Sequence, residues 1–198
     1  MRTTVLAAAL VLAACGGEPP VTRTAWKLET DLSTVGYVSI KAGDFAETNA
    51  FGRVVGRVEP TGEARISIDL DTVETNVDIR NERMRKVFFE TKTYPEAVVT
   101  LALDPAALQE LGVGDRLRID APLTLALHGE TAEYDAAMFV TRASADRVTV
   151  DLVRPILVDA REFGLENGLN ELMALAGLPS ITPTAPVTAS LVFTRADD

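Results

Sequence analysis

A short basic run is the first feature of the sequence that could do chemistry. Residues 80–92 carry five cationic side chains against the carboxylates of Glu82 and Glu90, which leaves a local charge of +3. One hypothesis is a cationic rim that meets a phosphate, carboxylate or quinone head group. The alternative is a solvated helical face held by ion pairs such as Glu82 with Arg85. The cationic residues are Arg80, Arg83, Arg85, Lys86 and Lys92.

The single histidine is the next candidate for chemistry. His128 directly precedes Gly129, so we expect a turn residue whose ring bonds to the backbone, with a role as head-group ligand or general base as the alternative. One His and one Cys exclude the usual His- or Cys-rich metal sites and most nucleophile–His pairs. The acidic stretch 69–74 alternates along a predicted strand, which favours a solvated outer face over a Ca²⁺ site. The sequence therefore predicts no enzyme, no metal site and no required cofactor.

The overall charge further limits the classes of molecule that the chain is expected to bind. The chain has 198 residues, with 19 basic and 29 acidic side chains and a formal net charge of −10. This length suits one domain with a sizeable core. Because phosphate affinity comes from clustered Lys and Arg, so acidic a chain is not expected to bind nucleic acid. Charge does not attract it to anionic lipid head groups either.

The N-terminal residues indicate an export signal. Arg2 is followed by an apolar run over residues 5–14, which suits a signal peptide and is too short to span a bilayer. The next residue is Cys15, and the sequence Leu-Ala-Ala-Cys that ends there resembles the lipobox of bacterial lipoproteins. This resemblance implies cleavage before Cys15 and acylation of that residue.

Acyl chains on Cys15 would anchor the protein to a membrane. Gly16, and not Asp, follows the cysteine, which in a Gram-negative cell favours the periplasmic face of the outer membrane. An ordinary secretory signal with a chance cysteine is the alternative. We therefore expect a signal peptide over 1–14, a lipidated cysteine and tether over 15–25, and one domain over 26–195.

The elements that must position any site are mainly strands. From Trp26 onward the dominant hydrophobic period is two, most clearly over 64–70, 97–103 and 117–127. Many such strands without βαβ alternation indicate a sandwich or a closed barrel. Pro122 marks a bulge or an edge position in its run. Further strands are expected over 134–142, 147–157 and 186–194, and weaker ones over 26–30, 34–41 and 51–58.

Three segments break the strand pattern and predict short helices. Residues 77–90 are charged and end in paired aromatics, and residues 105–111 follow Asp104, a suitable N-cap. Residues 168–177 predict an amphipathic helix that begins at Asn170 and ends at Gly177. This helix is either a movable lid or a static plug. Its apolar stripe consists of Leu169, Leu172, Met173 and Ala176.

The order of these features resembles the YceI-like family of lipid- and polyisoprenoid-binding proteins. The resemblance runs from about Trp26 to Phe193. The chain departs from the family in having only part of its glycine- and phenylalanine-rich strand, and in the helical insert over 165–180. The resemblance is carried by Phe51 with Gly56, by Val73-Glu74-Thr75 and Ile79-Arg80-Asn81-Glu82-Arg83-Met84, by Phe88-Phe89 with Thr93-Tyr94-Pro95, by Leu123-Thr124-Leu125 with Leu127-His128-Gly129, and by Arg161-Glu162-Phe163-Gly164.

The resemblance implies a mainly β fold, an antiparallel lipocalin-like barrel of about eight strands with short helices, one of them inserted before the last strand. It also implies a ligand, which would be a long-chain isoprenoid, a quinone or a fatty-acyl lipid held inside the barrel for sequestration or transport. An interior filled by its own side chains fits the alternating faces equally well. In that case the protein would be a structural or interaction lipoprotein. A homodimer is a further partner hypothesis.

The candidate site residues follow from this interpretation. The side chains expected to line the ligand tail are Ile66, Ile68, Leu70, Val99, Leu101, Leu123, Leu125, Leu127, Met138, Leu152, Leu191 and Phe193. Those expected at the mouth, where the head group would lie, are Arg80, Arg83, Met84, Phe88, Phe89 and His128. The methionine and the two phenylalanines either gate the cavity or cap the end of the barrel.

Overall fold

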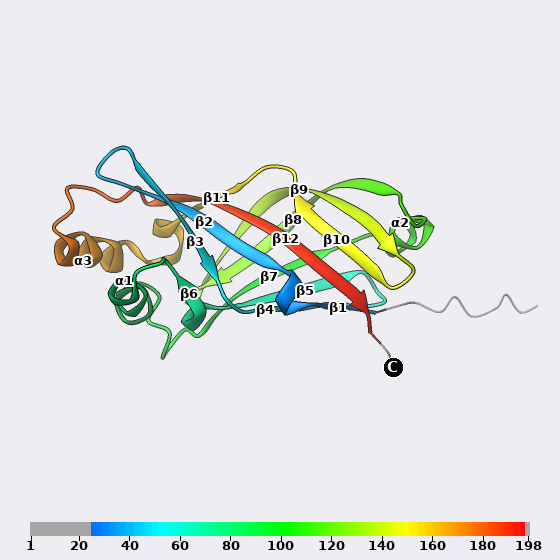
Figure 1. Ribbon diagram of the computed structural model, residues 1–198, viewed down its shortest axis with the longest axis horizontal. Coiled ribbons are helices and arrows are strands. Elements are labelled where there is room, and N and C mark those ends of the chain that lie inside the picture. Colours follow the sequence, from blue (N-terminus) through cyan, green and yellow to red (C-terminus); the bar gives the residue numbers. More distant parts are fainter. Residues whose placement is uncertain (1–24, 197–198) are drawn as a thin grey trace, which may run out of the picture.

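Eight antiparallel strands close into a ring in the computed structural model, which describes residues 25–196 (Figure 1). Around the ring they are β1 (Trp26–Leu28), β4 (Val54–Val58), β5 (Glu63–Asp69), β7 (Glu96–Ala102), β8 (Arg116–Leu127), β9 (Glu130–Ser144), β10 (Arg147–Leu152) and β12 (Thr184–Arg195). The ring closes at Trp26, which is paired with Val58 on one side and Arg195 on the other. The predicted mainly β, eight-stranded antiparallel barrel is confirmed.

Four further strands extend the sheet at one end: β2 (Thr34–Lys41), β3 (Phe45–Phe51), β6 (Val73–Glu74) and β11 (Ile156–Asp159). A 3-10 turn at Thr30–Leu32 separates β1 from β2, and both strands pair with β12. β2 pairs with β3, and β3 pairs with β6. The prediction did not include β3, because its sequence shows no clear apolar alternation; β2 supplies the edge on which it forms.

The β8–β9 hairpin is the longest pairing in the barrel. Its register runs without interruption from Arg116 to Leu127 and ends in a two-residue turn, where His128 and Gly129 both have positive φ, at 51° and 85°. Pro122 stays in this register and causes no bulge. Because β7 pairs only with residues 124–126 of β8, Pro122 lies at a free edge, which is the second of the two predicted outcomes.

The helices lie where the strand pattern breaks. They are α1 (Asp78–Arg83), followed directly by the π-helical turn η3 (Met84–Phe88), and then α2 (Pro105–Glu110), the 3-10 turn η4 (Ala160–Phe163) and α3 (Glu166–Ala176). The carboxylate of Asp104 caps α2 as predicted, accepting a hydrogen bond from the Ala106 N–H. The prediction that α3 begins at Asn170 is wrong. It begins at Glu166, because burial of Leu165 and Leu169 outweighs the preference for a polar cap.

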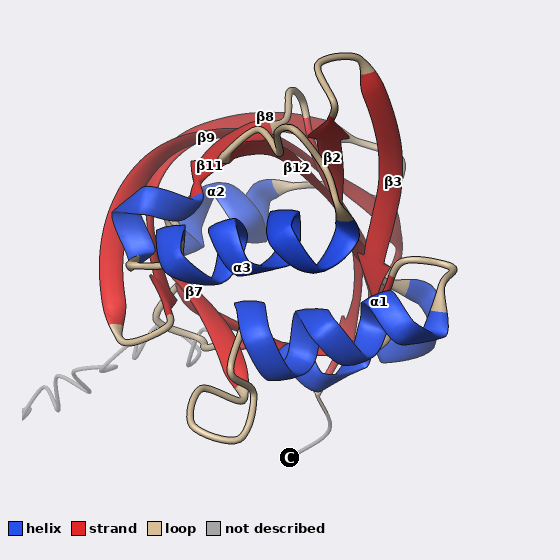
Figure 2. Cartoon of the chain, turned by 90° about the vertical axis from the view of Figure 1, so that its left-hand side faces the viewer, coloured by secondary structure: helices blue, strands red, loops and turns tan. Residues whose placement is uncertain are grey.

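The two ends of the barrel differ. α1 and α3 lie across one end (Figure 2), together with the β2–β3 hairpin. The opposite end carries α2, β1 and the last residues of β12 (Figure 1). There the Arg142 guanidinium lies over the ring of Trp26, 5.7 Å from its centroid.

Within residues 25–196, no helix combines the length and apolar character needed to cross a membrane. The predicted signal peptide, Cys15 and most of the predicted tether lie outside the described residues.

Candidate ligand cavity

A cavity of about 680 Å³ runs through the interior of the barrel. Its walls are mainly aliphatic and aromatic side chains. All twelve residues predicted to line a ligand tail lie along this cavity. Ordinary protein cores contain few voids larger than a water molecule, and ligand pockets range from about 300 to 1,000 Å³. The interior is therefore not filled by its own side chains.

Strand register explains how these walls form. Ile66 of β5 lies opposite Val99 of β7, and Val99 lies opposite Leu125 of β8. Because side chains alternate between faces along a strand, aligned residues in neighbouring strands form one continuous row inside the barrel. Leu123 and Leu127, two positions away on β8, extend the same wall.

The cavity reaches the surface at the end covered by α1 and α3. Val77, Ile79 and Leu175 line it and are also 42%, 54% and 46% exposed. The inner side of α3 is formed by Leu165, Leu169, Leu172 and Leu175. Met173, which was predicted in the apolar stripe, is not among the lining residues. Leu169, Leu172 and Ala176 of that predicted stripe do line the cavity, and Leu175 lines it with them.

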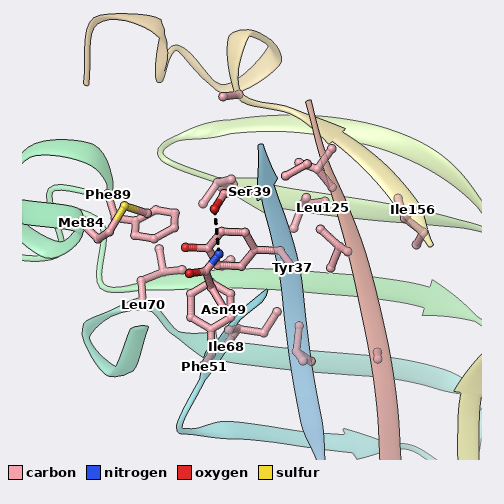
Figure 3. A pocket seen from close by; sticks show the side chains of 18 of the residues that line it. Tyr37, Ser39, Asn49, Phe51, Ile68, Leu70, Met84, Phe89, Leu125 and Ile156 are labelled. Atoms are coloured by element: carbon pink, nitrogen blue, oxygen red, sulfur yellow. Dashed lines mark hydrogen bonds between the residues drawn. The ribbon is translucent and has the colours of Figure 1, made fainter. Parts of the chain in front are cut away.

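Aromatic side chains from distant segments meet beside this mouth. The rings of Phe88 and Phe89 lie 4.8 Å apart between centroids, Phe89 lies 5.9 Å from Phe51, and Phe51 lies 5.7 Å from Tyr37. Met84 and Phe89 are buried and Phe88 is partly buried. All three predicted mouth residues of this group line the cavity, and Figure 3 shows Met84 and Phe89 there.

The basic run is largely neutralised by carboxylates. Arg80 Nη1 lies 2.8 Å from Glu47 Oε2, and Lys41 pairs with the same carboxylate. The hydrogen bond from Lys41 and the charges of Arg80 and Lys41 lower the pKa of Glu47. Of the five cations in the run, only Arg80 and Arg83 line the cavity.

The surface pair expected in this run has a different partner. Glu82 pairs with Lys86, four residues on, and not with Arg85. Arg85 instead lies 3.9 Å from Asp71, measured from Nε to Oδ1. These pairs show that much of the basic run forms an ordinary charged helical face.

His128 does not lie among the lining residues. Its Nδ1 is 3.2 Å from the Phe163 carbonyl oxygen, its Nε2 is 2.9 Å from Glu90 Oε2, and its ring is 4.2 Å from that of Tyr94. The ring thus joins the β8–β9 turn to η4 and to the segment after η3. This is the turn residue bonded to backbone that the sequence favoured, and the structure does not bring it to the mouth.

Buried hydrogen bonds hold α1 on the barrel. Asn81 Oδ1 accepts from the Thr75 backbone N–H at 2.8 Å and from the Thr75 hydroxyl at 2.6 Å. Its Nδ2 donates to Glu74 Oε1 at 3.0 Å, and the bonds from Asn81 and the backbone lower the pKa of Glu74. These contacts explain why the Glu74-Thr75 motif and Asn81 occur together. The same hydrogen bonds fix α1 and so position Arg80, Arg83 and Met84.

The sequence did not reveal the inner face of the β2–β3 hairpin. Tyr37, Ser39 and Lys41 of β2 point into the cavity, and so do Glu47 and Asn49 of β3. Apolar Val38 and Ile40 lie on the other face of β2, so the usual pattern is reversed here. The sequence signal for this polar inner face is the regular alternation of polar residues over 37–41. Figure 3 shows Tyr37, Ser39 and Asn49 together beside Phe51.

No metal site accompanies these features. Within the part of the chain that the structure describes, no three His, Cys, Asp or Glu side chains are grouped so that they could hold a metal ion. The arrangement offers an apolar hollow with a few hydrogen-bonding groups near one end.

Comparison with known proteins agrees with this geometry. A family described as the YceI-like domain matches residues 26–193. A polyisoprenoid-binding domain from Saccharophagus degradans, implicated in plant cell wall breakdown, is 38% identical, with a TM-score of 0.85 over 87% of this chain and 99% of that one. No curated protein sequence matches.

Two more distant structures share the fold. BcnA of Burkholderia cenocepacia has a TM-score of 0.62 at 18% identity, over 83% of this chain and 98% of its own. The YceI protein of Campylobacter jejuni has a TM-score of 0.52 at 12% identity, over 76% and 85%.

Proposed function

Because the chain belongs to the YceI-like family, we propose that its barrel binds one long, flexible apolar chain and sequesters or transports it without chemical change. The ligand class is a polyisoprenoid, a quinone with an isoprenoid tail, or a fatty-acyl lipid. The observation that carries this proposal is the cavity of about 680 Å³, lined along the barrel by Ile66, Val99, Leu125 and their neighbours. The 38% identical polyisoprenoid-binding domain supports the same ligand class.

The walls supply enough free energy for such a ligand. Burial of about ten methylene-sized groups contributes about 8 kcal/mol, at roughly 0.8 kcal/mol each. Before the costs of association are subtracted, this corresponds to a dissociation constant near 1 μM. Because apolar contacts are not directional, the tail would be selected by length and flexibility more than by detailed shape.

The direct test is mass spectrometry of an organic extract. The full chain is purified from its membrane fraction without denaturant and extracted, and the extract is compared with that of a soluble protein of similar size. A stoichiometric isoprenoid, quinone or fatty acid is expected. A blank extract that stays blank after incubation with each ligand class would refute the carrier function. It would then favour the alternative of a lipoprotein that docks a protein partner.

We further propose that Cys15 is acylated and that the protein lies on the periplasmic face of the outer membrane. The Leu-Ala-Ala-Cys sequence and the following Gly16 support this location. Labelling cells with an alkyne-tagged fatty acid should mark the native chain, and Cys15→Ser should abolish both the label and the membrane association. Label retained on the Cys15→Ser chain would place the modification elsewhere.

A further inference from the structure

The inner face of the β2–β3 hairpin changes from apolar to polar along its length. β2 and β3 pair so that Val35 lies opposite Phe51, Tyr37 opposite Asn49, and Ser39 opposite Glu47. All six side chains line the cavity. A polar patch on the inner face of a barrel strand is unfavourable unless its groups are hydrogen-bonded. Departures from the hydrophobic pattern of this kind are expected mainly at functional sites.

Asn49 is buried, at 6% exposure, and its amide is only partly satisfied. Its Nδ2 donates to Ser39 Oγ at 3.1 Å and to the Glu47 carbonyl oxygen at 3.2 Å. Because that carbonyl can only accept, the orientation of the amide is determined. No described residue donates a hydrogen bond to Oδ1, which is therefore a free acceptor facing the cavity (Figure 3).

Tyr37 contributes a hydroxyl from the position of β2 that is paired with Asn49. Burial raises the pKa of Tyr37 well above its ordinary value, so the phenol is uncharged and able to donate at neutral pH. Its hydroxyl has no hydrogen-bond partner among residues 25–196, whereas the hydroxyl of the other tyrosine in the cavity wall, Tyr134, bonds to Glu162. Tyr37, Ser39 and Asn49 therefore present donors and an acceptor in one place.

The charged side chains nearest to this position are engaged with one another. Lys41 and Arg80 share the single carboxylate of Glu47, which leaves a net charge of +1 over the three groups. Glu47 is the next inward-facing residue after Asn49 toward the hairpin tip, so the charged side chain nearest to Asn49 along β3 is a carboxylate. Only Arg83 among the lining cations has no ion pair in the described part of the chain, and it lies on α1.

We propose that Tyr37, Ser39 and Asn49 form a subsite for an uncharged, oxygen-bearing head group, a hydroxyl or a carbonyl, on the end of an apolar chain. This inference rests on the proposed function. Along β2, Ser39 lies about 7 Å and Tyr37 about 13 Å from Lys41, on the side away from the hairpin tip. The tail then extends past Val35 and Phe51 toward the closed end, where the lining residues are apolar, as at Leu101 and Phe193. The ligand thus enters tail first.

Two full-length variants and a matched control test this subsite. Tyr37→Phe removes only the hydroxyl, and Asn49→Leu replaces the amide with an apolar group of similar size. Thr48→Leu makes a comparable change one residue away, on the exposed outer face of β3. Native mass spectrometry then measures competition among geranylgeraniol, geranylgeranyl phosphate and a hydrocarbon with the same carbon skeleton, all in one detergent.

The native chain and Thr48→Leu should prefer the alcohol about tenfold over the hydrocarbon, as one or two net hydrogen bonds predict. Both subsite variants should lose this preference and keep their affinity for the hydrocarbon. Equal binding of alcohol and hydrocarbon by the native chain would overturn the subsite and leave the carrier function intact. Preference for the phosphate would also overturn it and would assign the head group to Arg83. Failure to bind any of the three would refute the carrier function for isoprenoids, and the subsite with it.

Discussion

Gly168 of α3 lies directly against the backbone of Val87 in η3: a Cβ atom at position 168 would come within 2.7 Å of the Val87 carbonyl oxygen. It would also lie 3.1 Å from the Cα of Phe88. α3 and η3, the helical turn that continues α1, therefore meet at a place where only glycine fits.

Gly168→Ala should separate these two elements. Alanine ordinarily favours a helix over glycine by about 0.5–1 kcal/mol, but here the methyl group meets backbone that cannot rotate away. We expect a net loss of about 1–3 kcal/mol in the free energy of unfolding and faster amide hydrogen exchange in α3. Asn170→Ala, at an exposed position on the same helix, should change neither. A Gly168→Ala protein as stable as the native one, with unchanged exchange, would show that the contact is loose.

Filling the cavity should compete with the ligand. Val99→Trp places an indole in the middle of the cavity wall and displaces about two methylene-sized groups of ligand, or about 1.6 kcal/mol. We expect about a tenfold loss of affinity for an isoprenoid alcohol, measured by native mass spectrometry. Thr100→Trp adds the same side chain to the outer face of β7 and should bind normally. Equal affinity in the two variants would argue against a ligand at Val99.

Removal of the Asn81 amide should loosen α1. Asn81→Leu leaves the buried Thr75 N–H and hydroxyl without their acceptor, which costs about 1–3 kcal/mol. Urea unfolding should show this loss. Glu82→Gln removes only the exposed pair with Lys86 on the same helix, so its effect should stay within about 0.5 kcal/mol. If Asn81→Leu leaves the free energy of unfolding unchanged, packing alone holds α1.

Alkaline pH should act on the barrel through Tyr37. Burial raises the pKa of this tyrosine in the folded state, so its contribution to stability is complete below the unfolded value of about 10 and is lost as pH rises above it. Ultraviolet titration should show one fewer late-ionising phenol in Tyr37→Phe. The stability of the native chain should also fall more steeply than that of Tyr37→Phe above pH 10. If the stability of the native chain and of Tyr37→Phe falls equally steeply above pH 10, the Tyr37 phenol ionises like an exposed one.

Side-chain alternation was sufficient to predict much of the cavity. Leu123, Leu125 and Leu127 occur at every second position of β8, and an apolar face of that kind can only point inward in a closed barrel. The Asp104-Pro105 pair likewise predicts the start of α2, because both residues act locally. Predictions of this type succeed where one face of an element is clearly apolar.

The β2–β3 hairpin could not be predicted in the same way. Hydrophobicity alone would turn Val38 and Ile40 inward, whereas the structure turns Tyr37 and Ser39 inward. Its register is set by pairing with β12 and by the short turn before β2, which are non-local contacts. The ion pairs of Glu47 with Lys41 and Arg80 also join three segments. The sequence alone therefore suggests more unpaired positive charge in residues 80–92 than the fold leaves.

The placement of β1 at the end opposite α1 and α3 has a consequence for orientation in the cell. If Cys15 is acylated, the nine residues between it and Ala25 allow a reach of at most about 35 Å over ten Cα–Cα steps, and the chain joins the barrel at the end opposite α1 and α3. The open end lies at the opposite end of the barrel from this attachment point. An upright barrel on such an anchor would present its open end to an opposing membrane or another carrier, whereas exchange with the lipids beneath the anchor would require the barrel to tip over on its tether.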